Sequence, residues 1–262
     1  MKIIRYQMND QVSYGILKGE EVYQLKGNVF KQFSRGEKIA DLEEVELLAP
    51  IEPPNLIAIG LNYRQHAEET GAEIPERPVV FLKATTSITD PDSEIILPQL
   101  AAEEVDYEAE LAVIIGKEAK NLETVEVSDY ILGYSCANDV SARDCQKKLD
   151  KQWARGKSFD TFCPIGPWIE TELNPMDCSI KSILNGKVMQ ESNTSDMIFN
   201  VEQLVSYLSH NMTLLPGTVI LTGTPEGVGF AREEKVFLRD GDEIVIEIEG
   251  VGRLKNVVVE EK

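Results

Sequence analysis

The chain has 262 residues, 42% of them hydrophobic and 27% charged, which is ordinary for a globular protein with one large domain or one domain plus a small appendage. The 45 Asp and Glu outnumber the 26 Lys and Arg, and the net charge of −19 disfavours binding to nucleic acid and to anionic membranes. No apolar run approaches the roughly 20 residues of a membrane helix, and the first ten residues lack the apolar core of a signal peptide, so we expect a cytoplasmic protein that binds no membrane.

Residues 1–48 are a series of short β-like runs broken at turn residues such as Gly15 and Gly19. The segment APIEPPN (49–55) then concentrates three prolines, which can continue neither a helix nor an interior strand. We therefore predict a small β-rich N-terminal domain over residues 1–50, packed on a larger domain over residues 51–262.

A strand is predicted at LIAIGL (56–61), and a short helix is predicted at NYRQHAEETG (62–71). In that helix Asn62 is the expected N-cap, Gln65 is its capping-box partner and Gly71 is the stop signal. Further strands are predicted at 79–84, 108–116 and 131–138.

Ser141 and Asp144 match a second capping box, which predicts a helix that continues to about Trp153. Asn185-Gly186 predicts a tight hairpin within 179–190, and Asn200 with Gln203 predicts the capped start of an amphipathic helix. Helices are few and do not alternate regularly with strands, so the expected fold class is a β-rich α+β domain.

Three acidic residues point to a metal site. Glu108 and Glu110 share one face of a predicted strand, and Asp139 follows the next apolar run. An exposed edge strand would also explain the pair, but the continuing run AVIIG favours burial, and buried acids need partners. An all-oxygen ligand set suits Mg²⁺, Mn²⁺ or Ca²⁺ better than Zn²⁺.

His66 and Glu69 lie three positions apart on the predicted helix 62–71, where they are near neighbours. A carboxylate that holds one ring nitrogen makes the other a usable general base, although a surface histidine beside acids is the simpler alternative. His210 has no such partner and is interpreted as structural or surface-exposed. The four cysteines form no CxxC motif and are expected to be reduced, apolar-like residues.

Several cationic and polar residues are candidates for substrate binding. Arg143 and Gln146 share the first turn of the predicted helix just past Asp139, and a guanidinium suits a carboxylate. Lys157 lies in GKSFD, which lacks the spacing of a phosphate-binding loop. For Lys157 and for Lys83 in VVFLKATT, a solvated lysine is the alternative.

The segment TGTPEGVG (222–229) follows a predicted strand and clusters three glycines. Such a turn can direct backbone N–H groups into an anion-binding nest, to which Thr222 and Thr224 would add hydroxyl donors. Ordinary tight-turn duty is the alternative.

The motifs taken together, in their order, resemble the fumarylacetoacetate hydrolase family over nearly all of residues 56–262. The segments that carry the resemblance are GLNYRQHAEE, FLKATTSITDP, VDYEAELAVIIGKEAKN, GYSCANDVSARDCQ, GKSFDTFCPIGPWI, LNGKVMQESNTSDMIFN and LLPGTVILTGTPEGVGF. The similarity is closest to the short bacterial and mitochondrial-type members, and residues 1–50 look like the variable leading domain that many members carry.

The resemblance implies rolled mixed β-sheets, a homodimer, and Mg²⁺ or Mn²⁺ held by residues that match Glu108, Glu110 and Asp139. It also implies that His66 and Glu69 are a catalytic base dyad on a helix that orders as a lid. Lys157 matches the family's site lysine, and Arg143, Gln146 and Thr224 match substrate-binding positions, with which we group Lys83.

These parts predict a hydrolase that cleaves a C–C bond in a 2,4-dioxo acid, with the pyruvate-like half leaving as an enolate. The same site supports an isomerase, tautomerase or decarboxylase acting on 2-hydroxyhepta-2,4-diene-1,7-dioate or oxaloacetate. A non-catalytic metal- or anion-binding protein is the alternative of a different class. Residues 70–77 and the N-terminal domain are where we expect the distal specificity to be set.

Overall fold

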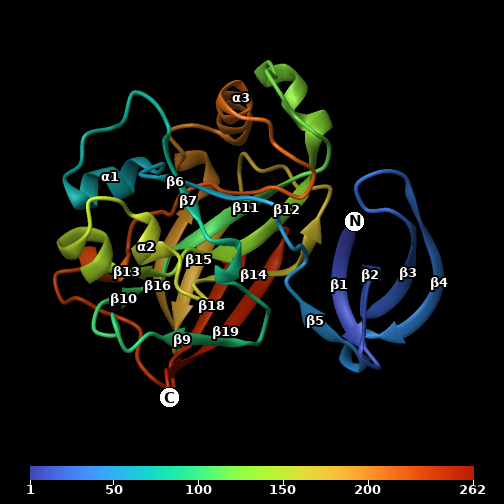
Figure 1. Ribbon diagram of the computed structural model, residues 1–262, viewed down its shortest axis with the longest axis horizontal. Helices are drawn as coiled ribbons and strands as arrows, with labels where there is room; N and C mark the ends of the chain where they lie inside the picture. The colour runs from blue at the N-terminus through green and yellow to red at the C-terminus, as the bar shows by residue number, and fades with distance from the viewer.

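The computed structural model covers residues 1–262 and confirms a β-rich fold with few, short helices (Figure 1). The strands form a 12-stranded mixed sheet, a five-stranded sheet and a two-stranded ribbon. No helix in the chain is both long and apolar enough to span a membrane.

The N-terminal strands form a curved antiparallel sheet at one side of the molecule (Figure 1). Its first strand also pairs antiparallel with a strand of the larger domain, through Lys2 opposite Glu170 and Ile3 opposite Ile169. The small sheet is therefore continuous with the 12-stranded sheet. The strands are β1 (Lys2–Met8), β2 (Gln11–Lys18), β3 (Glu21–Gly27), β4 (Phe33–Asp41) and β5 (Glu46–Leu48), with a 3₁₀ turn η1 (Leu42–Glu44).

The larger domain continues the 12-stranded sheet in the order β14-β12-β11-β17-β6-β7, where β17 runs parallel to β6 and the other neighbours in this order are antiparallel. Because β6 and β17 are parallel, the segments that follow them emerge at the same edge of the sheet. These strands are β6 (Leu56–Gly60), β7 (Val79–Lys83), β11 (Ala109–Ile115), β12 (Ile131–Asn138), β14 (Cys163–Glu170) and β17 (Val219–Leu221), with β8 (Ile88–Thr89) paired to β14.

The second sheet has the order β16-β15-β18-β19-β9. Its hairpin turns at Asn185-Gly186, both with positive φ, as predicted. The strands are β9 (Glu94–Leu97), β15 (Ser179–Leu184), β16 (Lys187–Asn193), β18 (Glu243–Ile248) and β19 (Gly252–Glu260), and the short ribbon is β10 (Val105–Asp106) with β13 (Ser141–Ala142).

Strand β11 is buried along its whole length and contributes to two hydrophobic cores. Leu111 and Val113 belong to the core that the second sheet and helix α3 (Val201–Asn211) also line. Ala112 and Ile114 face a second core, which includes Ile3 of the N-terminal domain. Burial on both faces explains why this strand reads as a continuous apolar run rather than an alternating one.

Two of the three predicted capping boxes are wrong, and the third is confirmed. Asn200 and Gln203 form the box at the start of α3. Helix α1 (Arg64–Thr70) does end at Gly71, with φ of 64°, but Tyr63 is its N-cap residue and makes no side-chain cap. The Asn62 side chain instead donates to the Phe199 and Thr222 carbonyls and accepts from the Phe199 N–H. It therefore joins three segments of the chain and does not cap the helix.

The predicted helix from Ser141 to Trp153 is also wrong. Ser141 belongs to β13, and its hydroxyl donates to the Asp139 carbonyl, so it is not available as a cap. A π-helical turn η4 (Cys145–Leu149) follows, and α2 (Ala154–Lys157) is a single turn. The remaining 3₁₀ turns are η2 (Thr85–Ser87), η3 (Thr124–Tyr130), η5 (Thr194–Asp196) and η6 (Gly229–Ala231).

Candidate active site

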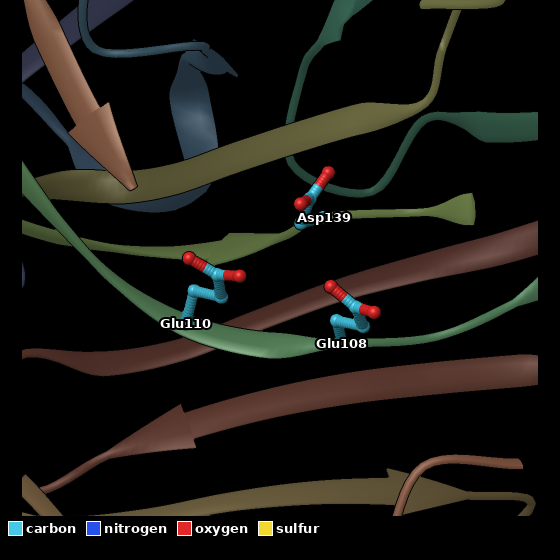
Figure 2. Close-up of side chains that lie close together, drawn as sticks. All are labelled: Glu108, Glu110 and Asp139. Carbon is cyan, nitrogen blue, oxygen red and sulfur yellow. The ribbon is translucent and has the colours of Figure 1, made fainter. Parts of the chain in front are cut away.

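The three predicted acidic ligands converge where one β-ladder ends and another begins. Glu110 pairs across the β11–β12 ladder, whereas Glu108 and Asp139 lie between that ladder and the β10–β13 ribbon. The Asp139 backbone N–H donates to the Glu108 carbonyl at 2.9 Å and keeps the two segments in register. Figure 2 shows the three carboxyl groups on the same side of these segments, and their oxygens lie within 4.8 Å of one another.

Two buried lysines neutralise part of this negative charge. The Lys157 ammonium lies 2.6 Å from both a Glu108 oxygen and an Asp139 oxygen. Lys83 forms an ion pair with the other Asp139 oxygen and donates to the Phe162 carbonyl at 2.9 Å. Lys83 is not among the residues that line the cavity, and its contacts hold the Asp139 carboxylate, so substrate binding by Lys83 stays a prediction.

The pKa values of Glu108 and Glu110 are shifted in opposite directions. Burial raises the pKa of Glu108, but Lys157 and Arg143 outweigh burial and bring this pKa down to about 2. Burial raises the pKa of Glu110 well above its usual range, and the charges of Asp139 and Glu108 add to this increase. The one hydrogen bond that Glu110 accepts, from the Gly223 N–H at 2.7 Å, uses Oε2 and leaves Oε1 unbonded.

Arg143 is held in place by two carboxylates. Its guanidinium lies 2.8 Å from Asp106 and 2.7 Å from Glu108, and Nη1 donates to the Gln146 amide oxygen at 2.8 Å. Asp106 is fully buried and also accepts from the Gly229 and Phe230 backbone N–H groups. The contacts of Asp106 therefore orient Arg143.

His66 and Glu69 form the predicted pair, with 2.7 Å between the ring Nδ1 and Glu69 Oε1. The other oxygen of Glu69 accepts from the Gly227 backbone N–H at 2.9 Å. The start of α1 is held by a distant residue, because the Gln65 N–H donates to the Asp196 carboxylate at 3.0 Å. With Nδ1 engaged by Glu69, Nε2 is the ring nitrogen left for chemistry.

The glycine-rich turn 222–229 binds anions, but the anions are side chains of the protein itself. Backbone N–H groups of Gly223, Gly227 and Gly229 donate to Glu110, Glu69 and Asp106 respectively. These three N–H groups are therefore not available to a substrate anion, whereas substrate binding by Thr224 stays a prediction. The turn instead connects the acidic cluster, the histidine pair and the arginine support.

A cavity of about 420 Å³ opens onto the acids and the histidine. Arg143, Gln146, Lys157 and Thr224 all line it, which agrees with the site positions that the family resemblance implied. Its remaining walls are largely apolar and aromatic, and they are formed by Ile59, Leu61, Ala72, Phe81, Trp153 and Phe230 together with Gly60, Thr70 and Lys147.

Comparison with known proteins identifies the family of this chain. Residues 55–259 match the model described as fumarylacetoacetate (FAA) hydrolase C-terminal, and residues 1–50 match the model described as Rv2993c-like, N-terminal. The chain belongs to the fumarylacetoacetate hydrolase family. This result confirms the resemblance and the fold expected from the sequence.

Similar members of the fumarylacetoacetate hydrolase family include isomerases and a hydrolase. The rat mitochondrial oxaloacetate tautomerase Fahd2a is 44% identical over 220 residues, which are 82% of this chain and 70% of the rat protein. The structure of a 5-carboxymethyl-2-hydroxymuconate delta-isomerase from Mycobacterium smegmatis has a TM-score of 0.90 and 42% identity over the full length of both chains. A maleylpyruvate hydrolase from Sphingobium sp. SYK-6, solved with manganese(II) and pyruvate, has a TM-score of 0.81 and 28% identity over both full chains.

The acidic cluster has the donor chemistry of a site for a divalent metal ion. The oxygens of Glu108, Glu110 and Asp139 are clustered and buried, and hard cations such as Mg²⁺ and Mn²⁺ prefer oxygen ligands. With Asp106 there are four buried carboxylates against the three cations Lys83, Arg143 and Lys157, which leaves one excess negative charge. A proton on Glu110 balances that charge, whereas a divalent cation in its place makes the site attractive to an anion.

Sequence reasoning missed two residues that shape the site. Gln190 donates from its amide to Thr224 Oγ1 at 2.8 Å and accepts from the Ala109 N–H at 2.9 Å, so it joins the turn to β11. Trp153 packs against Gly60, where a Cβ atom would come within 2.3 Å of the indole ring. In the sequence, the role of Gln190 was indicated only weakly, by a glutamine in the alternating pattern of β16. Nothing in the sequence indicated that Trp153 contacts Gly60.

Proposed function

We propose that the protein is a divalent-metal-dependent tautomerase or isomerase of a 2-oxo acid, with oxaloacetate and 2-hydroxyhepta-2,4-diene-1,7-dioate as the leading substrates. The observation that supports this proposal is the shared cavity, into which His66 and the three acids Glu108, Glu110 and Asp139 all project. Tautomerase and isomerase are also the activities in the names of relatives at 40% identity or more.

Keto–enol tautomerisation needs little more than this site offers. A proton is added at the carbon next to the 2-oxo group and another is removed from the enol oxygen. Glu108, Glu110 and Asp139 would hold Mg²⁺ or Mn²⁺, which when bound supplies Lewis-acid stabilisation of negative charge at the 2-oxo oxygen.

The protein's own groups supply the rest of the chemistry. Glu69 fixes the His66 ring through Nδ1, so Nε2 is placed to give or take the proton at carbon. Arg143 and Gln146 are hydrogen-bonded to each other in the cavity lining and are suited to a substrate carboxylate, as are Lys157 and Thr224, which also line the cavity. A catalytic role for His66, Glu69 and Lys157 is part of this proposal.

Hydrolysis of a C–C bond in an acylpyruvate is the second candidate, and it was our leading prediction from the sequence. The His66–Glu69 pair favours it, because a histidine oriented by a carboxylate can deprotonate a water molecule. The maleylpyruvate hydrolase is less similar to this chain than the isomerases are, so the comparisons favour the isomerase. A homodimer and a cytoplasmic location remain predictions.

An assay with enol oxaloacetate distinguishes the tautomerase from the hydrolase. The decay of its ultraviolet absorbance should be accelerated by protein with Mg²⁺ or Mn²⁺, and EDTA should abolish the acceleration. His66→Asn should lower kcat by about 10²- to 10⁴-fold, as expected for removal of a general acid–base group. Enol decay at the uncatalysed rate, together with release of pyruvate from an acylpyruvate, would replace the tautomerase with the hydrolase, and release of CO₂ would indicate a decarboxylase.

A further inference from the structure

Lys147 is a cation at the mouth of the active-site cavity. It lies in the turn η4, next to Gln146, and is one of the residues that line the cavity. Its ammonium lies 3.6 Å from the centre of the Phe230 ring, and the Arg143 guanidinium lies 4.3 Å from the same ring. The Phe230 ring therefore contacts two cations that both line the cavity.

The other cations around the acidic cluster are already committed to carboxylates of the protein. Lys83 pairs with Asp139, Lys157 pairs with Glu108 and Asp139, and Arg143 pairs with Asp106 and Glu108. Lys147 forms no ion pair with any residue of the chain. It is therefore the one lysine or arginine lining the cavity that no carboxylate of the chain pairs with.

The neighbouring Lys148 shows how an ordinary surface lysine behaves in this turn. Its ammonium points to Glu104, at 2.6 Å, and its side chain is 59% exposed. Lys147 is also exposed, but its ammonium lies against the Phe230 ring, and partial burial, followed by the like charge of Arg143, lowers the Lys147 pKa. Glu108 and Asp106 offset this shift only in part and form no ion pair with Lys147, so the position suits a ligand that brings an anion.

We propose that Lys147 binds the distal carboxylate of a 2-oxo dicarboxylate whose 2-oxo end lies at Glu108, Glu110 and Asp139. The aromatic walls Phe81 and Trp153 offer no competing charge to that carboxylate. Lys147 therefore selects dicarboxylates over 2-oxo monocarboxylates of the same length. This inference rests on the proposed function for the placement of the 2-oxo end.

The effect of a distal charge on binding can be measured with two stable ligands of equal chain length. 2-Oxoglutarate ends in a carboxylate, and 2-oxovalerate ends in a methyl group. Their binding to the Mg²⁺-loaded protein is measured by calorimetry for wild type, Lys147→Met, Lys147→Arg and the matched control Lys148→Met. Wild type should prefer 2-oxoglutarate. Lys147→Met should weaken 2-oxoglutarate binding by roughly ten- to a hundred-fold, as for loss of a charge-assisted hydrogen bond, and should leave 2-oxovalerate within about twofold.

Lys147→Arg should keep the preference for 2-oxoglutarate, and Lys148→Met should behave as wild type. The inference is overturned if wild type does not prefer 2-oxoglutarate, if Lys147→Met weakens both ligands equally, or if Lys148→Met has the same effect. The binding assay needs no turnover. A protein that fails to ketonise enol oxaloacetate but discriminates the two ligands through Lys147 would refute the proposed function and retain the distal carboxylate site.

Discussion

Asp106 is the buried residue on which the position of Arg143 most depends. It accepts from the arginine Nε at 2.9 Å and from three backbone N–H groups, those of Tyr107, Gly229 and Phe230. Asp106→Asn keeps the shape but removes the charge, and should lower the free energy of unfolding by about 3 kcal/mol, as for one broken partner of a buried ion pair. Urea denaturation measures this loss.

The exposed pair Glu104–Lys148 provides the control for Asp106→Asn. Its side chains are 21% and 59% exposed, so Glu104→Gln should change stability by less than about 1 kcal/mol. Equal effects of Glu104→Gln and Asp106→Asn would contradict the role assigned to Asp106.

Cys163 gives a prediction about alkaline pH. Burial raises the pKa of its thiol to about 12, with Lys83 opposing and Asp139 adding to the increase. In the unfolded chain the thiol ionises near pH ~8.5, so between these two values the folded state holds more protons than the unfolded state. The free energy of unfolding should therefore fall as pH rises through this window, by at most about 1.4 kcal/mol per pH unit from this residue.

Cys163→Ala should make that alkaline loss shallower. Denaturation curves for wild type and variant at about pH 8 and about pH 10 measure the two slopes. If both proteins lose the same free energy between these pH values, the thiol remains accessible to base in the folded state and the prediction is wrong.

At the residue scale, the sequence was informative where a chemical requirement fixes a residue type at a given spacing. Glu108 and Glu110 are two apart on an extended segment, and His66 and Glu69 are three apart on a helix, so local geometry alone brings each pair together. Lys83 had no such local signal, and only the tertiary structure shows that it contacts Asp139.

At the element scale, helix α1 depends on a partner far along the chain. Asp196 accepts from the Gln65 N–H, and its carbonyl accepts from the Arg64 guanidinium. Asp196→Ala should loosen α1 and speed amide hydrogen exchange over residues 64–70, with a loss of about 1 kcal/mol, as for other caps. Because α1 carries His66, kcat/KM should fall as well.

Asp177→Ala is the matched control for Asp196→Ala. Asp177 is an exposed acid that accepts from the Asn193 amide at 2.9 Å and forms no hydrogen bond with α1. Its loss should leave exchange in residues 64–70 unchanged. If the two variants affect exchange in α1 equally, Asp196 is not its cap.

Helix α1 also shows why helix N-caps were predicted less well from the sequence than strands were. Asn62 and Ser141 have the side chains that favour N-caps, but each forms a non-local or turn hydrogen bond instead. The cap of α1 comes from a residue 131 positions away in the chain, which no local pattern predicts. Strand positions were predicted well, because burial of β11 on both faces fixes its apolar run.

At the scale of the whole molecule, the acidic cluster couples metal binding to stability. It connects β11, the end of β12 and, through Gly223, the turn after β17, which are central parts of the 12-stranded sheet. A cation that binds only the folded site raises the free energy of unfolding by about 2.7 kcal/mol at a concentration of a hundred times Kd. Mg²⁺ or Mn²⁺ should therefore raise Tm, and EDTA should reverse the increase.

Glu110→Gln makes this test specific to the metal site. The amide resembles the protonated acid that the raised pKa of Glu110 favours without metal, so the metal-free variant should keep a Tm close to that of the metal-free wild type. With one ligand charge removed, added Mg²⁺ should no longer shift its Tm, whereas Glu104→Gln should keep the full shift. If Glu110→Gln still gains as much stability from Mg²⁺ as wild type does, the cation binds elsewhere, and the electrostatic basis of the proposed tautomerase is lost.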